Sequence, residues 1–413
     1  MKRLHHAWLI CLGGALSLCI CMGLGVNVFS IYQPEIIDVL NLTNAQGSWI
    51  TTTRTLFILG TLFVVNRVCD TLGLRLTITL GSTFLGVSCL CYSAATSFSM
   101  CCVAAALTGI GYCLGGMVPL TLIIDRWFHS RRSLALGISA AGSGVSTILA
   151  PPILTWVMEN KGLSTAFLAE GVTILIFAGL LWFLLRSDPS DLDLIPYEEE
   201  DSPSAKAVAQ KRSHLPPMSR SMQASLIFAV ALTGAPGGPG FSHLGVLYTS
   251  SGYDSMMVAT ITSYLGILVC LGKIFAGQIY DRLGGRLGNL FCFGAFTLSM
   301  VLCALTPLAG GHPLFPFIGI TFFGLGAPIA GLATSLWAAD LFSEQNYENG
   351  VRRLNMAFSL GMLITGPIPG ILADHLGNYG YAYALFALAL TLSFLLVQSL
   401  YFKRDVGQRQ SKA

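Results

Sequence analysis

Long apolar stretches alternate with short polar segments along the whole chain. A helix needs about 20 apolar residues to cross a ~30 Å hydrocarbon core, because its backbone polar groups pair within the segment. We therefore predict an all-α membrane protein of twelve transmembrane helices. The predicted spans are 7–33, 45–66, 76–95, 99–124, 133–158, 163–186, 223–250, 255–280, 287–307, 313–339, 352–373 and 379–402.

One hydrophilic segment, residues 187–222, divides these spans six and six. It begins acidic, turns basic and contains several prolines, so it is too polar to bury a core and is predicted to be a flexible cytoplasmic linker. The predicted parts are an N-terminal six-helix bundle (1–186), the linker (187–222), a C-terminal six-helix bundle (223–402) and a cytoplasmic tail (403–413).

Composition and charge agree with a membrane location. Of the 413 residues, 54% are hydrophobic and only 10% charged, whereas soluble chains carry about 25% charged residues. Basic residues lie on alternate connections, with Lys161 alone on the other side, so both termini are predicted to be cytoplasmic. The first span follows Lys2 and Arg3 without a small-residue cleavage site and is interpreted as an uncleaved anchor. We expect a monomer in a bacterial inner membrane.

Several functional classes find no support in the sequence. The twelve cysteines form no CxxC motif and lie almost entirely within spans, which favours packing over metal or redox chemistry. No span contains HExxH or G-x-S-x-G, so no enzymatic activity is expected. No basic surface interleaved with aromatic residues indicates nucleic-acid binding. We predict no metal and no cofactor.

A short polar loop occurs twice, once after the second span of each half. The copies are NRVCDTLGLR at 66–75 and GQIYDRLGGR at 277–286, and the fourth span of each half also ends in an aspartate followed by an arginine pair. Two related halves are typical of transporters that alternate around a site near the midplane. The residues expected to latch such movements are Asp70, Arg75, Arg131, Arg132, Gly277, Asp281, Arg282 and Arg286.

The second copy, G-x-x-x-D-R-x-G-x-R, resembles the cytoplasmic loop signature of the major facilitator superfamily. The stretch Trp127–Gly144 is similar to the junction of spans 4 and 5 in the monocarboxylate transporter family and its bacterial oxalate/formate antiporter relatives. The segment Gly23–Phe29, followed by Tyr32-Gln33-Pro34, resembles the same bacterial members. The resemblance implies the fold of that superfamily and transport of a small organic anion. The small residues of 137–144 also predict close packing of span 5 on a neighbouring helix.

Lys273 lies deep in the eighth predicted span. A charge at mid-membrane costs about 2.5–3.5 kcal/mol and usually faces a cavity or a partner. In the family that the chain resembles, a basic residue at this place, usually Arg, grips the substrate carboxylate. Here a lysine stands instead, so a point charge replaces the guanidinium group, which can bind a carboxylate through two hydrogen bonds. The alternative is a lysine that snorkels to the cytoplasmic side. Val269 stands where mammalian members carry an acid, which puts their proton relay in doubt.

Three polar residues are further candidates for substrate contacts. His243 follows the Pro- and Gly-rich run 236–240, where a broken helix would expose backbone groups, and it titrates near neutrality. It either carries the coupled proton and binds substrate, or is a buried structural histidine. Tyr112 either donates its hydroxyl hydrogen to the substrate carboxylate or serves only in aromatic packing. Asn27 either contacts the substrate or bridges two helices.

Two charged residues remain inside predicted spans. Arg54 either guides anions inward or snorkels outward toward Glu35 or Asp38. Glu170 is the only acid well inside a span, and it is either a proton site or makes a structural hydrogen bond.

These features predict a secondary transporter that moves a small monocarboxylate, such as lactate, pyruvate or formate, together with H⁺ by alternating access. The alternatives are an exchanger of the oxalate/formate type, a non-transporting membrane sensor, and a drug exporter.

Overall fold

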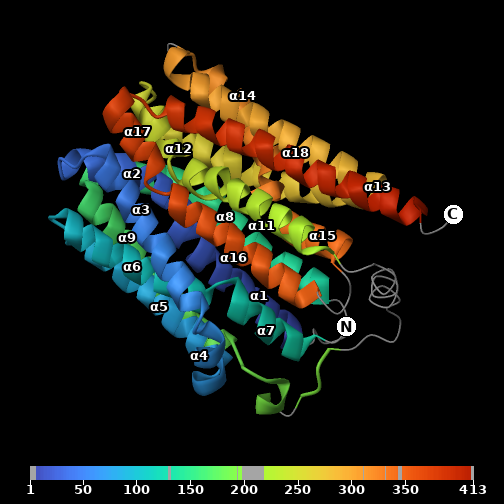
Figure 1. Ribbon diagram of the computed structural model, residues 1–413. Coiled ribbons are helices and arrows are strands. Elements are labelled where there is room, and N and C mark those ends of the chain that lie inside the picture. Colours follow the sequence, from blue (N-terminus) through green and yellow to red (C-terminus); the bar gives the residue numbers. More distant parts are fainter. Residues whose placement is uncertain are drawn as a thin grey trace. The chain divides into compact units, whose positions relative to one another are not determined.

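The computed structural model describes residues 6–128, 132–192, 194–197, 218–309, 311–330, 332–342 and 347–410. Within these ranges the regular structure is helical, apart from one isolated parallel bridge between Phe128 and Tyr197 (Figure 1). The chain forms two compact units. Unit 1 comprises residues 1–202 and 255–266, and unit 2 comprises 203–254 and 267–413.

Unit 1 contains the first six predicted spans. Its elements are α1 (His6–Leu18), η1 (Cys19–Asn27), α2 (Phe29–Val39), α3 (Asn44–Leu62), α4 (Val65–Leu72), α5 (Leu74–Ser93), α6 (Phe98–Gly115), α7 (Met117–Trp127), α8 (Arg132–Lys161), α9 (Leu163–Leu184) and the 3-10 turn η2 (Pro189–Leu192). The first residues of α13 also belong to this unit.

Unit 2 contains the remaining helices and most of α13. Its elements are α11 (Arg220–Ala235), η3 (Pro236–Gly240), α12 (Leu244–Ser250), α13 (Ser255–Leu305), η4 (Thr306–Leu308), α14 (Leu314–Gly326), η5 (Ala327–Ala330), α15 (Leu332–Leu341), α16 (Tyr347–Thr365), α17 (Ile368–Leu376) and α18 (Gly380–Gln410).

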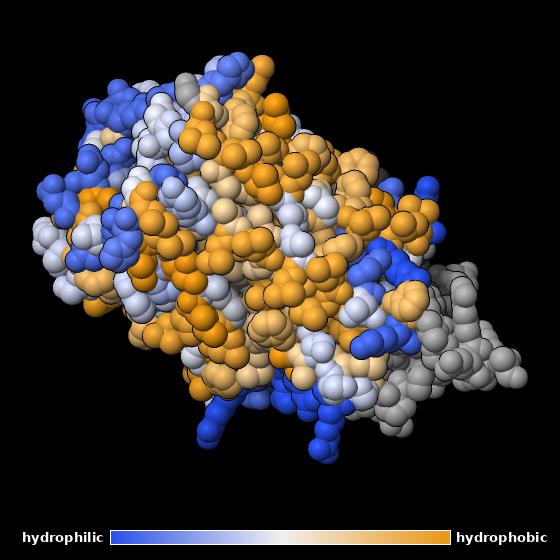
Figure 2. Space-filling view, turned by 45° about the horizontal axis from the view of Figure 1, so that its top comes forward, coloured by the Kyte–Doolittle hydropathy of each residue, from blue (hydrophilic) through white to orange (hydrophobic). Residues whose placement is uncertain are grey.

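Every predicted span coincides with helical structure, which confirms the prediction of an all-α membrane protein. Among the described residues, nine helices are long and apolar enough to cross a membrane, or eleven when two pairs bent by 58° and 54° each count as one span. Leu314–Ala330, at the start of the predicted tenth span, forms a shorter apolar helix. Figure 2 shows hydrophobic side chains over much of one face, with hydrophilic ones toward its margins. Such an apolar surface suits contact with lipid.

The two copies of the loop pattern have the same backbone geometry. Gly73 has φ 79° and ψ 154°, and Gly284 has φ 80° and ψ 168°, a region that is essentially restricted to glycine. The element α13 contains both the eighth and the ninth predicted spans, and Gly284 interrupts it between them. The arginine that ends each copy also packs on an aromatic ring of its own unit: Arg75 lies 3.9 Å from the Trp182 ring and Arg286 lies 5.4 Å from the Phe402 ring. The internal repeat seen in the sequence therefore extends to conformation and packing.

Small residues bring α8 close to the first span, as the glycine-rich run predicts. The Ser139 hydroxyl donates to the Cys11 carbonyl oxygen at 3.1 Å. A Cβ atom at Gly142 would overlap the carbonyl group of Ala15. In unit 2, a Cβ at Gly361 would overlap the carbonyl of Ala231 in the same way. Both contacts depend on the absence of a side chain.

We expect Gly142→Ala to destabilise the protein by about 1–3 kcal/mol, because the added methyl group forces two closely packed helices apart. Gly137→Ala is the matched control, since Gly137 lies on the same helix and an added methyl group there would have nothing within 4 Å. Thermal unfolding of the purified variants measures the difference. Equal melting temperatures for the two variants would contradict the packing described for α1 and α8.

The beginning of the predicted linker packs on unit 1. The Arg126 guanidinium pairs with Asp188 at 2.7 Å, and the Trp127 indole donates to the Arg186 carbonyl at 3.0 Å. The Tyr197 backbone N–H donates to the Trp127 carbonyl at 2.9 Å. Residues 187–192 and 194–197 of the predicted linker thus include contacts with helices of unit 1, and the flexibility of the segment stays a prediction. Residues 198–217 of the linker lie outside the described residues.

Candidate functional site

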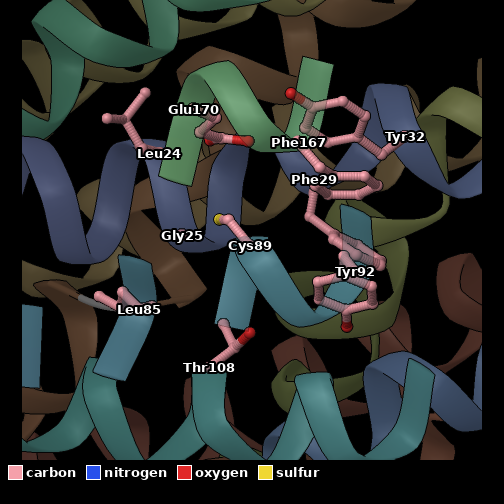
Figure 3. A pocket seen from close by; sticks show the side chains of 10 residues that line it. All are labelled: Leu24, Gly25, Phe29, Tyr32, Leu85, Cys89, Tyr92, Thr108, Phe167 and Glu170. Atoms are coloured by element: carbon pink, nitrogen blue, oxygen red, sulfur yellow. The ribbon is translucent and has the colours of Figure 1, made fainter. Parts of the chain in front are cut away.

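A small cavity lies inside unit 1, among α2, η1, α5, α6 and α9 (Figure 3). Its free space, which is partly open, is about 260 Å³, but it is so narrow that it has room for about one water molecule. An organic anion does not fit there in this conformation. The lining residues are Leu24, Gly25, Phe29, Tyr32, Leu85, Cys89, Tyr92, Thr108, Phe167 and Glu170.

Glu170 and Tyr32 are the buried polar groups at one end of this cavity. Glu170 is 3% exposed on α9, and Tyr32 is 1% exposed on α2. Within the described part of the chain, neither Glu170 Oε1 nor Tyr32 Oη has a hydrogen-bond partner. The two groups are close enough to interact electrostatically, and in Figure 3 the carboxyl and the phenol hydroxyl point toward one another.

Aromatic rings from three helices hold these groups in place. The rings of Tyr32 and Phe167 stack at a centroid distance of 4.1 Å, and Phe167 stacks on Tyr92 at 5.0 Å. Phe29 lies 5.5 Å from Tyr92. We call these four residues the aromatic stack. Since large rings have few rotamers, their packing gives the neighbouring polar groups defined positions.

Arg54 adjoins the other side of the aromatic stack. It belongs to α3, is 5% exposed, and its guanidinium carbon lies 5.3 Å from the centroid of the Phe29 ring. The hydroxyl groups of Tyr92 and Tyr112 are near enough to interact with its charge. The burial of the Arg54 side chain agrees with the alternative in which it points into the protein and attracts anions. It does not agree with a side chain that snorkels outward to water.

The other two candidates in unit 1 have different environments. Asn27, at the end of η1, donates from Nδ2 to the Thr147 hydroxyl on α8 at 2.9 Å, which agrees with a bridge between two helices. Tyr112 is half-buried on α6. The structure thus brings Arg54 and Tyr112 together, whereas Asn27 is engaged with Thr147.

In unit 2, Lys273 is exposed on α13 and His243 is completely buried after η3. The Nδ1 atom of His243 lies 2.8 Å from the Pro239 carbonyl oxygen. Because a carbonyl can only accept, Nδ1 is the donor, and Nε2 is the ring nitrogen that can gain or lose a proton. Burial and this hydrogen bond agree with the structural alternative for His243. The exposure of Lys273 agrees with both of its alternatives.

The structure describes the side chains of some of the residues expected to act as a latch, and not of others. Asp70 and Arg282 are exposed, Gly277 and Arg286 are half-buried, and Arg75 Nε donates to the Trp182 carbonyl at 2.8 Å. The acceptor is thus a carbonyl near the negative end of α9. Arg131 and the side chains of Arg132 and Asp281 lie outside the described residues. Trp182 and Phe402, the rings beneath Arg75 and Arg286, were not identified from the sequence.

Metal-binding chemistry receives no geometric indication within the described ranges, where no three His, Cys, Asp or Glu side chains gather. The cysteines described there are free thiols.

Known structures share the fold at low sequence identity. A mutant of the nucleoside transporter NupG superposes with a TM-score of 0.75 at 13% identity, covering 96% of this chain and 100% of that one. A D-xylose-proton symporter superposes with a TM-score of 0.71 at 12% identity, covering 95% of this chain and 96% of that one. These similarities establish the architecture alone.

Sequence comparisons are more specific. Monocarboxylate transporter 13 of Rattus norvegicus is 24% identical over 90% of this chain and 83% of its own length. MFS-type transporter 1 of Ophiocordyceps sp. (strain BCC 1869) is 26% identical over 91% of this chain and 80% of its own. The family model described as Major Facilitator Superfamily matches residues 15–346. This chain is a multi-pass membrane transporter that belongs to the Major Facilitator Superfamily.

Proposed function

We propose that this transporter moves a small organic monocarboxylate across the membrane together with one proton, by alternating access. The observation that carries the proposal is the pair of basic residues within apolar helices, Arg54 in α3 and Lys273 in α13. A cation in such a place is costly unless an anion compensates it, and a substrate carboxylate is such an anion. The monocarboxylate transporters among the relatives support the same substrate class.

Each candidate residue has a proposed role. Lys273 binds the substrate carboxylate as a point charge, and Arg54 is the buried cation of unit 1. Tyr112 and Asn27 offer hydrogen-bond donors to the substrate, and His243 offers one when its Nε2 atom is protonated. Either His243 or Glu170 accepts the proton. The latch residues of the two loop copies stabilise one conformational state.

Pairing one proton with one monoanion makes the transport cycle electroneutral. Moving one elementary charge through 100 mV changes the free energy by about 2.3 kcal/mol, a term that cancels when H⁺ and a monoanion move together. We also propose that both termini are cytoplasmic, since basic residues near both termini and in the loop copies recur on alternate connections, and basic connections favour the cytoplasmic side.

A thermal-shift screen of the purified protein tests the substrate class. We expect L-lactate, pyruvate or formate to raise the melting temperature, since a ligand at about a hundred times its Kd adds about 2.7 kcal/mol to the stability of the state that binds it. Oxalate and the lipophilic cation tetraphenylphosphonium serve as comparison ligands. Stabilisation by oxalate alone would redirect the proposal to an exchanger of dicarboxylates. Stabilisation by the cation alone would contradict anion transport.

A further inference from the structure

The cavity of unit 1 places two incompletely satisfied polar groups next to a water-sized space. Glu170 Oε1 and Tyr32 Oη are buried, and neither has a partner among the residues described. A buried polar atom without a hydrogen bond is unfavourable, so both atoms favour a partner in that space. Figure 3 shows both groups at the same end of the cavity, whereas the Tyr92 hydroxyl points away from them.

One water molecule meets the geometric requirements of this space. The cavity has room for about one, and a buried water needs two to four polar partners. The carboxyl group of Glu170 and the hydroxyl of Tyr32 supply two. A water that bridges them would contact the Glu170 carboxyl, which can bind a proton. The Tyr32 hydroxyl would hold the same water in place.

The same aromatic stack connects this pair to Arg54. Phe29 lines the cavity with Glu170 and also lies beneath the Arg54 guanidinium, at 5.3 Å. Tyr92 lines the cavity as well, and its hydroxyl interacts with the Arg54 charge. Unit 1 thus holds a buried basic group and a buried acidic group on two sides of one cluster. A buried charge is tolerated when an opposite charge compensates it.

We propose that Glu170 is the carrier of the coupled proton, bound through one water shared with Tyr32, and that this proton is taken up when a substrate carboxylate becomes the counter-charge of Arg54. Without substrate, Arg54⁺ and Glu170⁻ sum to zero. With the anion bound, a proton from water bonds to a Glu170 carboxylate oxygen, so Arg54⁺, the anion and neutral Glu170 again sum to zero. This inference rests on the proposed function and names the coupling site within it.

The surroundings of Glu170 single it out as the group that titrates. The titratable groups facing the cavity from neighbouring helices are Tyr32 of α2 and Cys89 and Tyr92 of α5. Phenols and thiols ordinarily ionise well above neutral pH, so a carboxyl is the group here that can exchange a proton. The lining from η1 and α6 contributes no ionisable group, and α1 and α8 contribute no lining residue.

Infrared titration of the full-length purified protein tests the proton site without any substrate. We expect a carboxyl band that appears and disappears with pH in the wild type and is absent in Glu170→Gln. Glu159→Gln, an exposed carboxyl on α8, should retain the band. Tyr32→Phe should move its midpoint by about one pH unit, because the water loses one of its partners. Tyr248→Phe, an equally buried tyrosine of unit 2, should leave the midpoint unchanged.

Proton uptake on adding L-lactate in weakly buffered solution tests the coupling. We expect about one proton per bound anion in the wild type and none in Glu170→Gln, which should still bind L-lactate. An unchanged titrating band, or unchanged proton uptake, in Glu170→Gln overturns the proposal. Binding of L-lactate without proton uptake in the wild type overturns the coupling alone. If L-lactate, pyruvate and formate all fail to bind the wild type, the proposed function fails, whereas the infrared result on Glu170 stands.

Discussion

Arg54→Gln is expected to lower the initial rate of L-lactate uptake into proteoliposomes by at least about thirtyfold. Loss of one partner from a buried charge pair costs about 2–5 kcal/mol, and Gln keeps much of the side-chain volume while removing the charge. Arg67→Gln is the matched control, since Arg67 is exposed on α4. Uptake by Arg54→Gln at the rate of Arg67→Gln would contradict a role for this cation.

The double variant Arg54→Gln/Glu170→Gln tests whether the two charges compensate each other in the folded protein. If Arg54 and Glu170 compensate each other, Arg54→Gln leaves Glu170 without its counter-charge, so neutralising both residues should destabilise the protein less than the sum of the two single changes. Thermal unfolding of the four proteins measures this coupling. Strictly additive losses would show that the two groups do not interact.

Lys273→Ala is expected to abolish most of the stabilisation by L-lactate in the thermal-shift assay. Removing the point charge that binds the carboxylate should weaken binding by at least about thirtyfold, or about 2 kcal/mol. Lys273→Arg should keep part of the affinity, because the charge is retained while its geometry changes. Lys161→Ala, on the exposed end of α8, is the control. An undiminished shift in Lys273→Ala would assign this lysine to snorkelling.

The transmembrane helices could be predicted because the hydrocarbon core imposes a length and a composition that a single sequence displays. Some interruptions could be predicted as well. The Pro- and Gly-rich run 236–240 indicated the bend before Leu244, and the polar loop 277–286 separates the two spans that form α13. The bend between Leu62 and Val65 could not be predicted, because it lies within an apolar stretch. Gly284 is the second glycine of the loop signature G-x-x-x-D-R-x-G-x-R, and its positive φ was found only in the structure.

The contacts at the beginning of the linker could not be predicted for a different reason. Composition indicates a polar segment, and the structure adds the Arg126–Asp188 pair and the hydrogen bond from the Tyr197 backbone to Trp127. Such contacts join residues far apart in sequence, which local composition does not reveal.

The candidate residues could be found from the sequence because charges inside apolar helices are rare. Their environments could not. Phe167 and Tyr92 approach Tyr32 from different helices, and no spacing rule within one helix predicts that stack. The orientation of Arg54 depends on the same tertiary contacts. Trp182 and Phe402 had a weak signal, since each is an aromatic residue near the end of the last span of its half.

Uptake of radiolabelled L-lactate into proteoliposomes, with pH gradient and membrane potential imposed separately, tests electroneutral monocarboxylate transport most directly. An inward proton gradient at zero potential should drive accumulation, and a membrane potential at equal pH should drive none, because the proton and the anion cancel in charge. Accumulation driven by potential alone, or an absence of uptake for L-lactate, pyruvate and formate under a proton gradient, would contradict it.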